Sequence, residues 1–392
     1  MNDQQTDIII IGAGMVGSAA ALSLARQGFK ITLIEASETP QWSEEDYGLR
    51  VSAISAASER LLDDIGAWQH VINRRVSPYQ SMHVWDASGS ACLDFDAADT
   101  SQAYLGYIVE NNLINVCLLE QINGMPNVNL LTGVRLSGMT WMDGYIEVKL
   151  DSGNEIRGTL VIAADGGNSQ VRTYCGIGSS TYDYQQTGIV ARVRTSLPHE
   201  QTAWQRFLPT GPLAFLPLAD GSCSIVWSAD TAFADELLAL DDEVFSQQLS
   251  EAFEHRLGHV EMLSPRAGFP LMLANADSYS TDRVVLLGDA AHRVHPLAGQ
   301  GVNLGFQDVI NITSILLEAV QKGRDLADPL YLRKYSRSRR ADAGLMLAGM
   351  DGIQRVFTSD YVAVQKSRNL AMDLINRLPG LKQFFVNRAL GN

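Results

Sequence analysis

Three glycines near the N-terminus, Gly12, Gly14 and Gly17, have the spacing of a loop that binds the pyrophosphate of a dinucleotide. They follow a β-branched run over residues 7–11 and precede an alanine- and leucine-rich stretch over residues 18–27. We therefore expect a strand, a glycine turn and a helix. In such a unit the first glycine permits the tight turn, the second lets the backbone approach the phosphates, and the third lets helix and strand pack closely. The helix N-terminus then offers unpaired N–H groups and the positive end of its dipole to the phosphates.

An acidic residue, Glu35, ends a second expected strand over residues 30–35 and lies 23 residues after Gly12. An acid at this place can accept hydrogen bonds from the ribose hydroxyls of a dinucleotide. Because the strands, the glycines, the helix and the acid all agree, the sequence predicts a bound dinucleotide. This unit alone does not separate FAD from NAD.

Two aspartates, Asp165 and Asp289, each lie in a glycine turn directly after an apolar run, over residues 158–164 and 283–287. In open α/β sheets, ligands bind at the edge formed by the carboxyl ends of the strands. Alone, each aspartate is more often a turn former than a ligand. Three such turns in one chain favour a shared ligand site.

Taken in order, GAGMVG with Glu35, then ADGGNSQVR, then GDAAHRVHPLAGQGVNLG resemble the three signatures of the single-component class A flavoprotein monooxygenases, the p-hydroxybenzoate hydroxylase type. The resemblance spans nearly the whole chain. It implies FAD as cofactor and O₂ as oxidant. The electron donor is NAD(P)H or another reductant, because the sequence has no clear separate NAD fingerprint. By resemblance, Asp165 supports the flavin and Asp289 holds its ribityl and ribose part.

The cofactor site implied by these motifs draws on all three. The residues predicted to bind the cofactor are Gly12, Ala13, Gly14, Met15, Val16, Gly17, Glu35, Arg50, Asp165, Gly166, Gly288, Asp289, Gly301, Val302 and Asn303. The residues predicted at the reactive edge of the flavin are Pro296, Gly299 and Gln300. A helix opening over residues 302–306 can direct its N–H groups at the flavin N1–C2=O edge and stabilise the charge of reduced flavin. His292 and His295 are interpreted as loop residues, and no metal site is predicted.

Segments over residues 49–55, 106–111, 214–218 and 224–228, with PLAGQGVNLG, resemble more closely the ubiquinone-biosynthesis hydroxylases, which act on polyprenylated phenols and quinols. The resemblance implies that a flavin C4a-hydroperoxide transfers its distal oxygen to an electron-rich ring carbon. The segment AWQRFLPTGPLAFLPL favours a later demethoxy or methoxy quinol as substrate. In this branch Arg50 is expected to approach the flavin, with a surface ion pair as the alternative.

Two other functions remain open on the same fold. One is an FAD-dependent reductase of a prenylated lipid. The other is a non-catalytic escort for a prenylated lipid, which the intact Glu35, Asp165 and Asp289 disfavour. The resemblance also implies membership of a ubiquinone-biosynthesis complex and a homo-oligomeric state as further expectations.

The predicted fold is α/β, with a Rossmann-like FAD-binding domain of the p-hydroxybenzoate hydroxylase type, an antiparallel β-sheet substrate domain and a C-terminal helical region. The expected boundaries are 1–75, 104–180 and 270–330 for the FAD-binding domain, 76–103 and 181–269 for the substrate domain, and 331–392 for the helical region. Four aromatic residues are candidates to line an apolar substrate cavity, although aromatics at strand spacing are more often core. They are Trp204, Phe207, Phe215 and Trp227.

The charge of the chain is unevenly distributed. It has 30 Lys and Arg and 44 Asp and Glu, a formal net charge of −14, which disfavours nucleic acid as a partner. Residues 331–392 hold 11 basic and 4 acidic side chains, a formal +7, which leaves −21 on the rest. We expect a cytoplasmic protein, because there is no basic leader and the cysteines are scattered. Residues 331–392 are expected to contact the inner membrane peripherally or to pack on the flavin domain.

Overall fold

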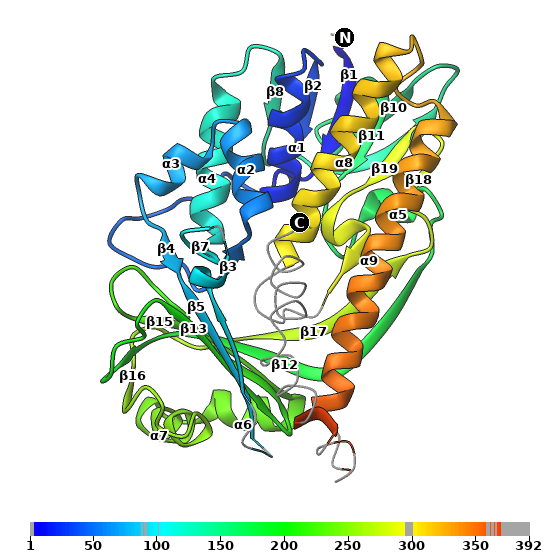
Figure 1. Ribbon diagram of the computed structural model, residues 1–392. Helices are drawn as coiled ribbons and strands as arrows, with labels where there is room; N and C mark the ends of the chain where they lie inside the picture. The colour runs from blue at the N-terminus through cyan, green and yellow to red at the C-terminus, as the bar shows by residue number, and fades with distance from the viewer. Residues whose placement is uncertain are drawn as a thin grey trace.

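The computed structural model contains two large β-sheets, one above the other in Figure 1, with helices on their outer sides. It describes residues 4–87, 89, 92–100, 102–294, 301–357, 361, 364 and 367–369. The predicted α/β class, with a second, mostly antiparallel sheet and a C-terminal helix, is confirmed.

The first sheet carries the predicted glycine turns. Its strands are β1 (Gln4–Ile11), β2 (Ile31–Ile34), β8 (Val128–Leu131), β9 (Leu136–Trp141), β10 (Ile146–Leu150), β11 (Glu155–Ala163), β18 (Ser280–Thr281) and β19 (Val284–Leu286). The order along the sheet is β18-β19-β11-β1-β2-β8, and β10 and β9 extend it from β11. The strands β19, β11, β1, β2 and β8 run parallel to one another. Their carboxyl ends therefore meet at one edge of the sheet.

Helices cover the first sheet because its central strands are apolar on both faces. Ile8, Ile9 and Ile10 of β1 are fully buried, as expected for a central parallel strand. The helix α1 (Met15–Ala25) follows β1 and packs against α4 (Asn111–Asn123) and α8 (Gly301–Gln321). The helix predicted to open at residues 302–306 is α8.

The second sheet has the order β20-β17-β12-β15-β14-β13-β5-β6, with β16 beside β12. Its strands are β5 (Ser81–Asp86), β6 (Cys92–Asp96), β12 (Ser179–Thr195), β13 (Thr202–Leu208), β14 (Gly211–Pro217), β15 (Cys223–Asp230), β16 (Val260–Met262), β17 (Ala267–Ala276) and β20 (His292–Arg293). The pair β20–β17 was not predicted, because the sequence after Asp289 reads as a loop. Residues 292–293 instead pair with Ala274 and Asn275, which ties the third motif to the second sheet.

The remaining elements join or cover the sheets. The strands β3 (Val51–Ile54), β7 (Gly106–Glu110) and β4 (Ser77–Tyr79) form a small sheet. The other helices are α2 (Ala56–Asp64), α3 (Trp68–Ile72), α5 (Gln170–Tyr174), α6 (Thr231–Ala239), α7 (Asp242–Ala252) and α9 (Pro329–Phe357), with 3₁₀ turns η1 (Ala97–Asp99) and η2 (Gly288–Ala290). Figure 1 shows α6 and α7 on the outer face of the second sheet and α9 along one side of the molecule.

The domain boundaries expected from the sequence stay a proposal, and the two sheets can be compared with them. The elements of the first sheet lie within 1–75, 104–180 and 270–330, and the body of the second sheet lies within 76–103 and 181–269. The strands β12 and β17 run across the proposed boundaries. Among the described residues, no helix is long and apolar enough to cross a lipid bilayer.

Candidate cofactor site

The three predicted glycine turns come together at the carboxyl edge of the first sheet. Ile11 is paired with Ala163, and Ala163 is paired with Leu286. The turns that begin at Gly12, Asp165 and Gly288 therefore lie next to one another. The parallel register alone produces this arrangement, because each motif follows its strand at once.

Two of the glycines allow the backbones to touch. Gly12 has φ +100°, and a Cβ there would lie 2.3 Å from the carbonyl oxygen of Ala164. A Cβ on Gly17 would lie 1.9 Å from the carbonyl oxygen of Gly12. Only glycine fits at either position, so α1 can start directly above the ends of β1 and β11.

Gly14 faces open space, unlike Gly12 and Gly17. A Cβ on Gly14 would meet no atom within 4 Å. Gly14 is also the N-cap of α1, and no side chain caps the first turn. The first amides of α1 are thus open to an anionic group, which is the arrangement that a pyrophosphate requires.

The Glu35 carboxylate is held by the backbone at the end of β2. Its Oε2 accepts a hydrogen bond from the Ala13 amide at 2.7 Å, and its Oε1 accepts one from the Ser37 amide at 2.9 Å. These bonds fix the carboxylate beside the glycine turn. Each oxygen keeps a lone pair for a ribose hydroxyl, so contact with the ribose stays a prediction that the geometry fits.

The two aspartates of the other motifs have acceptor capacity to spare. Asp165 Oδ2 accepts from the Val171 amide at 3.2 Å, while its Oδ1 is buried without a partner among the described residues. A buried acceptor left unpaired is costly, and a donor on a bound cofactor would satisfy it. Asp289 is exposed, and none of its described neighbours forms a hydrogen bond with it. Both aspartates fit a polar cofactor such as FAD.

An arginine of the second motif, Arg172, joins two of the turns. One guanidinium nitrogen donates to the Ala290 carbonyl at 2.8 Å, and the other donates to the Gly167 carbonyl at 2.8 Å. Arg172 therefore fixes the second motif against the third. The sequence placed Arg172 in a motif but did not identify this contact, because the two carbonyls lie 123 positions apart.

The side chain of Asn303 binds protein backbone. Its amide nitrogen donates to the Ala53 carbonyl at 2.7 Å, and its Oδ1 accepts from the Ser55 amide at 3.1 Å. These bonds anchor the first turn of α8 to the end of β3. The predicted contribution of Asn303 to cofactor binding stays a prediction, and these two bonds show that its side chain also anchors α8.

Replacing Asn303 with leucine is expected to lower the free energy of unfolding by about 2–4 kcal/mol, because a buried amide and a carbonyl lose their partners. Asn311 on the same helix is a matched control, because its side-chain oxygen is buried without a described hydrogen-bond partner. Asn311→Leu should change the stability much less. Urea unfolding of both variants measures the difference, and equal losses would contradict the anchoring role.

Arg50 points across to the second sheet. Its guanidinium carbon lies 5.3 Å from the ring centre of Phe269 on β17. The described residues include no acidic partner for Arg50, so they do not support the ion-pair alternative. Arg50 is exposed at the start of β3, beside the anchored first turn of α8. Its approach to the flavin stays a prediction.

The residues predicted at the flavin's reactive edge are not placed. Pro296, Gly299 and Gln300 lie outside the described residues, as does His295. Gly301 and Val302 begin α8, directly after that segment. His292, interpreted from the sequence as a loop residue, lies in β20 instead; it is buried, and its Nε2 is 2.6 Å from Asp308 Oδ2. The part of the chain that the structure describes contains no group of side chains able to hold a metal ion.

The four aromatic candidates divide between the two faces of the second sheet. Trp204, Phe215 and Trp227 pack with Phe245 and Phe253 in the core under α6 and α7, away from the first sheet. Phe215 and Trp227 are core residues, the alternative that strand spacing left open, and Trp204 is half-buried against them. Phe207 lies on the opposite face.

The face of the second sheet opposite α6 and α7, here called the flavin-side face, is also apolar. Ala203, Ala214 and Leu216 of this face pack with Tyr79 and Ile108 of the small sheet. At its far end, the ring of Phe207 stacks on Phe357 at the end of α9, with ring centres 3.9 Å apart. Phe207 is thus the one aromatic of the four that the structure places on the face expected to meet a substrate.

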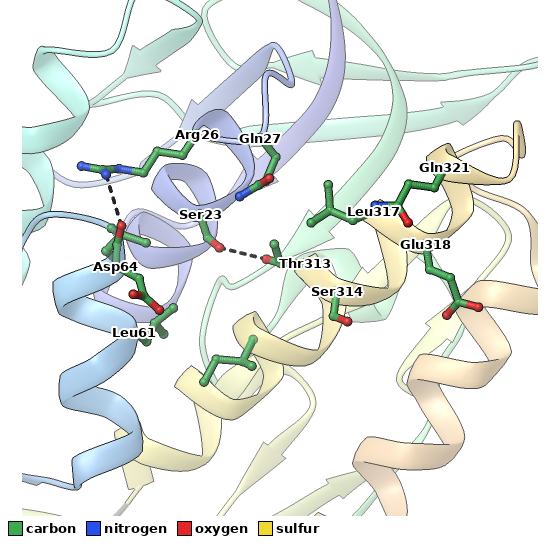
Figure 2. Close-up of a pocket in the computed structure, with 12 residues that line it drawn as sticks. Ser23, Arg26, Gln27, Leu61, Asp64, Thr313, Ser314, Leu317, Glu318 and Gln321 are labelled. Carbon is green, nitrogen blue, oxygen red and sulfur yellow. Dashed lines mark hydrogen bonds between the residues drawn. The ribbon is translucent and has the colours of Figure 1, made fainter.

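A groove of about 530 Å³ lies between α1, α2 and α8, and Figure 2 shows its walls. Ser23 and Thr313 are hydrogen-bonded at 3.0 Å in its floor, and Arg26 donates to the Asp64 carbonyl at 3.1 Å on its rim. The lining residues come from the end of α1, the end of α2 and the middle and end of α8, whereas the motifs lie before the first turns of α1 and α8. None of the predicted site residues lines the groove.

Comparisons with known proteins give a family model and relatives that span nearly the whole chain. The family model "FAD binding domain" matches residues 5–348. The chain is 38% identical to the 3-demethoxyubiquinol 3-hydroxylase of Escherichia coli K12, over 100% of both chains. It is 37% identical to the ubiquinone biosynthesis monooxygenase COQ6 of Danio rerio, over 96% of this chain and 88% of that one.

A solved structure supports the fold. The p-nitrophenol 4-monooxygenase PnpA of Pseudomonas putida DLL-E4 superposes with a TM-score of 0.81 at 18% identity, over 99% of this chain and 98% of that one. At this identity the likeness concerns the fold alone. Together with the full-length relatives and the family model, it identifies the chain as an FAD-dependent monooxygenase of the family that includes the ubiquinone-biosynthesis hydroxylases.

Proposed function

We propose that this enzyme hydroxylates the aromatic ring of a polyprenylated phenol or quinol intermediate of ubiquinone biosynthesis, and that its substrate is a later demethoxy or methoxy quinol. The observation that carries the proposal is the full-length match, at 38% identity, to a relative named as a 3-demethoxyubiquinol 3-hydroxylase.

The proposed roles follow from the contacts of the chain. The first amides of α1 bind the pyrophosphate, Glu35 binds the ribose, and Asp165 and Asp289 bind the remaining polar groups of FAD. FAD, when bound and reduced by the electron donor, would supply the electrons that activate O₂, so that one oxygen atom enters the ring and the other leaves as water. The second sheet holds the substrate ring over the cofactor and excludes water. Pro296, Gly299 and Gln300 are proposed at the reactive edge.

Complementation tests the substrate. The chain is expressed in bacterial strains that each lack one ring hydroxylase of the pathway, and the accumulated quinones are identified by mass spectrometry. We expect ubiquinone to return in the strain that accumulates a demethoxy or methoxy quinone. A product with a saturated prenyl chain would indicate the reductase, and a purified protein without flavin absorbance would indicate the escort.

We further propose that the enzyme is cytoplasmic and touches the inner membrane through residues 331–392, within a complex or homo-oligomer of the pathway. The helix α9 supports this. Arg333, Arg337 and Arg340 are exposed on α9, and their described neighbours include no acidic partner for them. Leu345 is also exposed on α9, with 63% of its surface accessible, although it lies further around the helix than the arginines. Exposed basic groups with an apolar group beside them suit an anionic lipid surface.

Replacing these three arginines with glutamine is expected to weaken binding to vesicles of phosphatidylcholine and phosphatidylglycerol by about 100-fold, since each basic side chain near an anionic surface contributes about 1 kcal/mol. Co-sedimentation measures this. The control replaces three exposed arginines elsewhere, Arg135, Arg194 and Arg256. Equal binding by both triple variants, or binding to pure phosphatidylcholine, would refute the proposed contact.

A further inference from the structure

Asp308, on the inner side of α8, is a fully buried carboxylate with three strong donors. Its Oδ2 accepts from the Gly288 amide at 2.8 Å and is 2.6 Å from His292 Nε2. Its Oδ1 accepts from Arg339 Nε at 2.6 Å. The side chains of Asp308, His292 and Arg339 are 0%, 2% and 5% exposed. None of these three residues was among the predicted cofactor ligands.

The network compensates the cost of a buried charge. A carboxylate taken out of water is stable only if opposite charges and donors replace its hydration. Burial opposes the ionisation of Asp308, but His292 and Arg339 together hold its pKa below the ordinary value. Arg339 also donates from Nη1 to Oδ2 of the half-exposed Asp342 at 2.8 Å, and from Nη2 to the Leu304 carbonyl at 3.3 Å. Asp308 is therefore a fixed, ionised anchor between α8 and α9.

Asp308 contacts the third motif on both sides of Asp289. Gly288 and His292 both bind the same oxygen of Asp308, and Asp289 lies between them in the η2 turn. The two bonds hold the turn at both ends and leave the Asp289 side chain exposed. A Cβ on Gly305 would lie 3.4 Å from the Gly288 Cα, so α8 also packs directly against the turn. The turn has little freedom to shift.

We propose that Asp308 and Arg339 are positioning residues for the cofactor site. Asp308 holds the η2 turn so that Asp289 faces the ribityl chain of FAD, and Arg339 makes α9 part of the cofactor site. This inference rests on the proposed contact between Asp289 and FAD. It does not depend on which phenol or quinol the enzyme hydroxylates.

The first test is Asp308→Asn in the full chain. An asparagine presents an NH₂ group to donors and leaves Arg339 without its buried counter-charge. We expect the dissociation constant of FAD, measured by fluorescence titration of the apo-protein, to rise by about 10- to 100-fold. Hydrogen exchange at the Gly288 amide of the apo-protein should accelerate, because a neutral amide oxygen accepts its hydrogen bond more weakly than the carboxylate does. The reduction potential of bound flavin should shift as well.

Matched variants separate positioning from simple destabilisation. Asp342→Asn removes the outer, half-exposed partner of Arg339 and should leave FAD binding unchanged. Arg339→Gln should weaken FAD binding, and combining it with Asp308→Asn should add little, since both disrupt one network. Arg339→Lys keeps the charge and should lose less than Arg339→Gln. If Asp308→Asn does not fold, FAD binding by the Arg339→Gln and Arg339→Lys variants tests the positioning role.

The inference is overturned if Asp308→Asn or Arg339→Gln lowers the melting temperature but leaves FAD affinity, flavin potential and Gly288 exchange unchanged. That result would assign the network to the core alone. Failure of the complementation experiment with normal FAD binding would instead refute the proposed substrate. The two failures are therefore distinguishable.

Discussion

Gly17→Ala is expected to destabilise the apo-protein by about 3 kcal/mol or more and to abolish FAD binding. The added Cβ would lie 1.9 Å from the Gly12 carbonyl oxygen and 3.1 Å from the Ala164 Cβ. Both neighbours belong to central strands or their turns and cannot retreat without separating α1 from the sheet. Overpacking lowers stability even where neighbouring side chains can adjust, and a backbone carbonyl adjusts less than a side chain.

Gly14→Ala is the control for this prediction. A Cβ at Gly14 meets no atom within 4 Å, so the apo-protein should keep nearly its full stability. The same methyl group would occupy the approach of the pyrophosphate, and FAD should bind more weakly. Urea unfolding of the apo-proteins and FAD titration report the two effects separately. Wild-type stability of Gly17→Ala would show that the contact between α1 and β1 is looser than described.

Asp289→Asn is expected to raise the dissociation constant of FAD by about 10- to 100-fold and to leave the stability of the apo-protein within about 0.5 kcal/mol of the wild type. The reason is that Asp289 is exposed and unpaired among the described residues. Its loss costs the fold nothing, whereas a hydrogen bond from a ribityl hydroxyl to a charged group is strong.

The matched control is Asp282→Asn, an exposed aspartate at the other end of β19. It removes the same charge just before the strand that Asp289 follows, at the end away from the glycine turns, and FAD affinity should not change. Fluorescence titration and calorimetry check both variants. If Asp289→Asn lowered stability without changing FAD affinity, Asp289 would be a turn former and the third motif would need another ligand.

The cofactor motifs could be predicted because their chemistry is local in the chain. Gly12, Gly14 and Gly17 directly follow the strand that positions them, and Asp165 and Asp289 directly follow theirs. When each ligand lies next to its own strand, a parallel sheet brings all of them to one edge without further information. The same locality explains why the start of α8 was predicted within one residue.

The substrate face could not be predicted in this way. Alternation along β13 shows that Trp204 and Phe207 point to opposite faces. It does not show which face α6 and α7 cover, because that depends on where distant helices return to the sheet. The same limit hid the double contact of Asn303 with β3, about 250 positions earlier in the chain.

The opening glycine pattern, Glu35 and the two later aspartates thus predicted a dinucleotide-binding α/β domain from the sequence, and the family resemblance of these motifs implied FAD and an enzyme. Only the tertiary structure decided how the site is held. Arg172 joins two motifs, and Asp308 with Arg339 links the third motif to α9. The sequence contains these residues but not their contacts, because a buried hydrogen bond depends on distances in space and not on spacing along the chain.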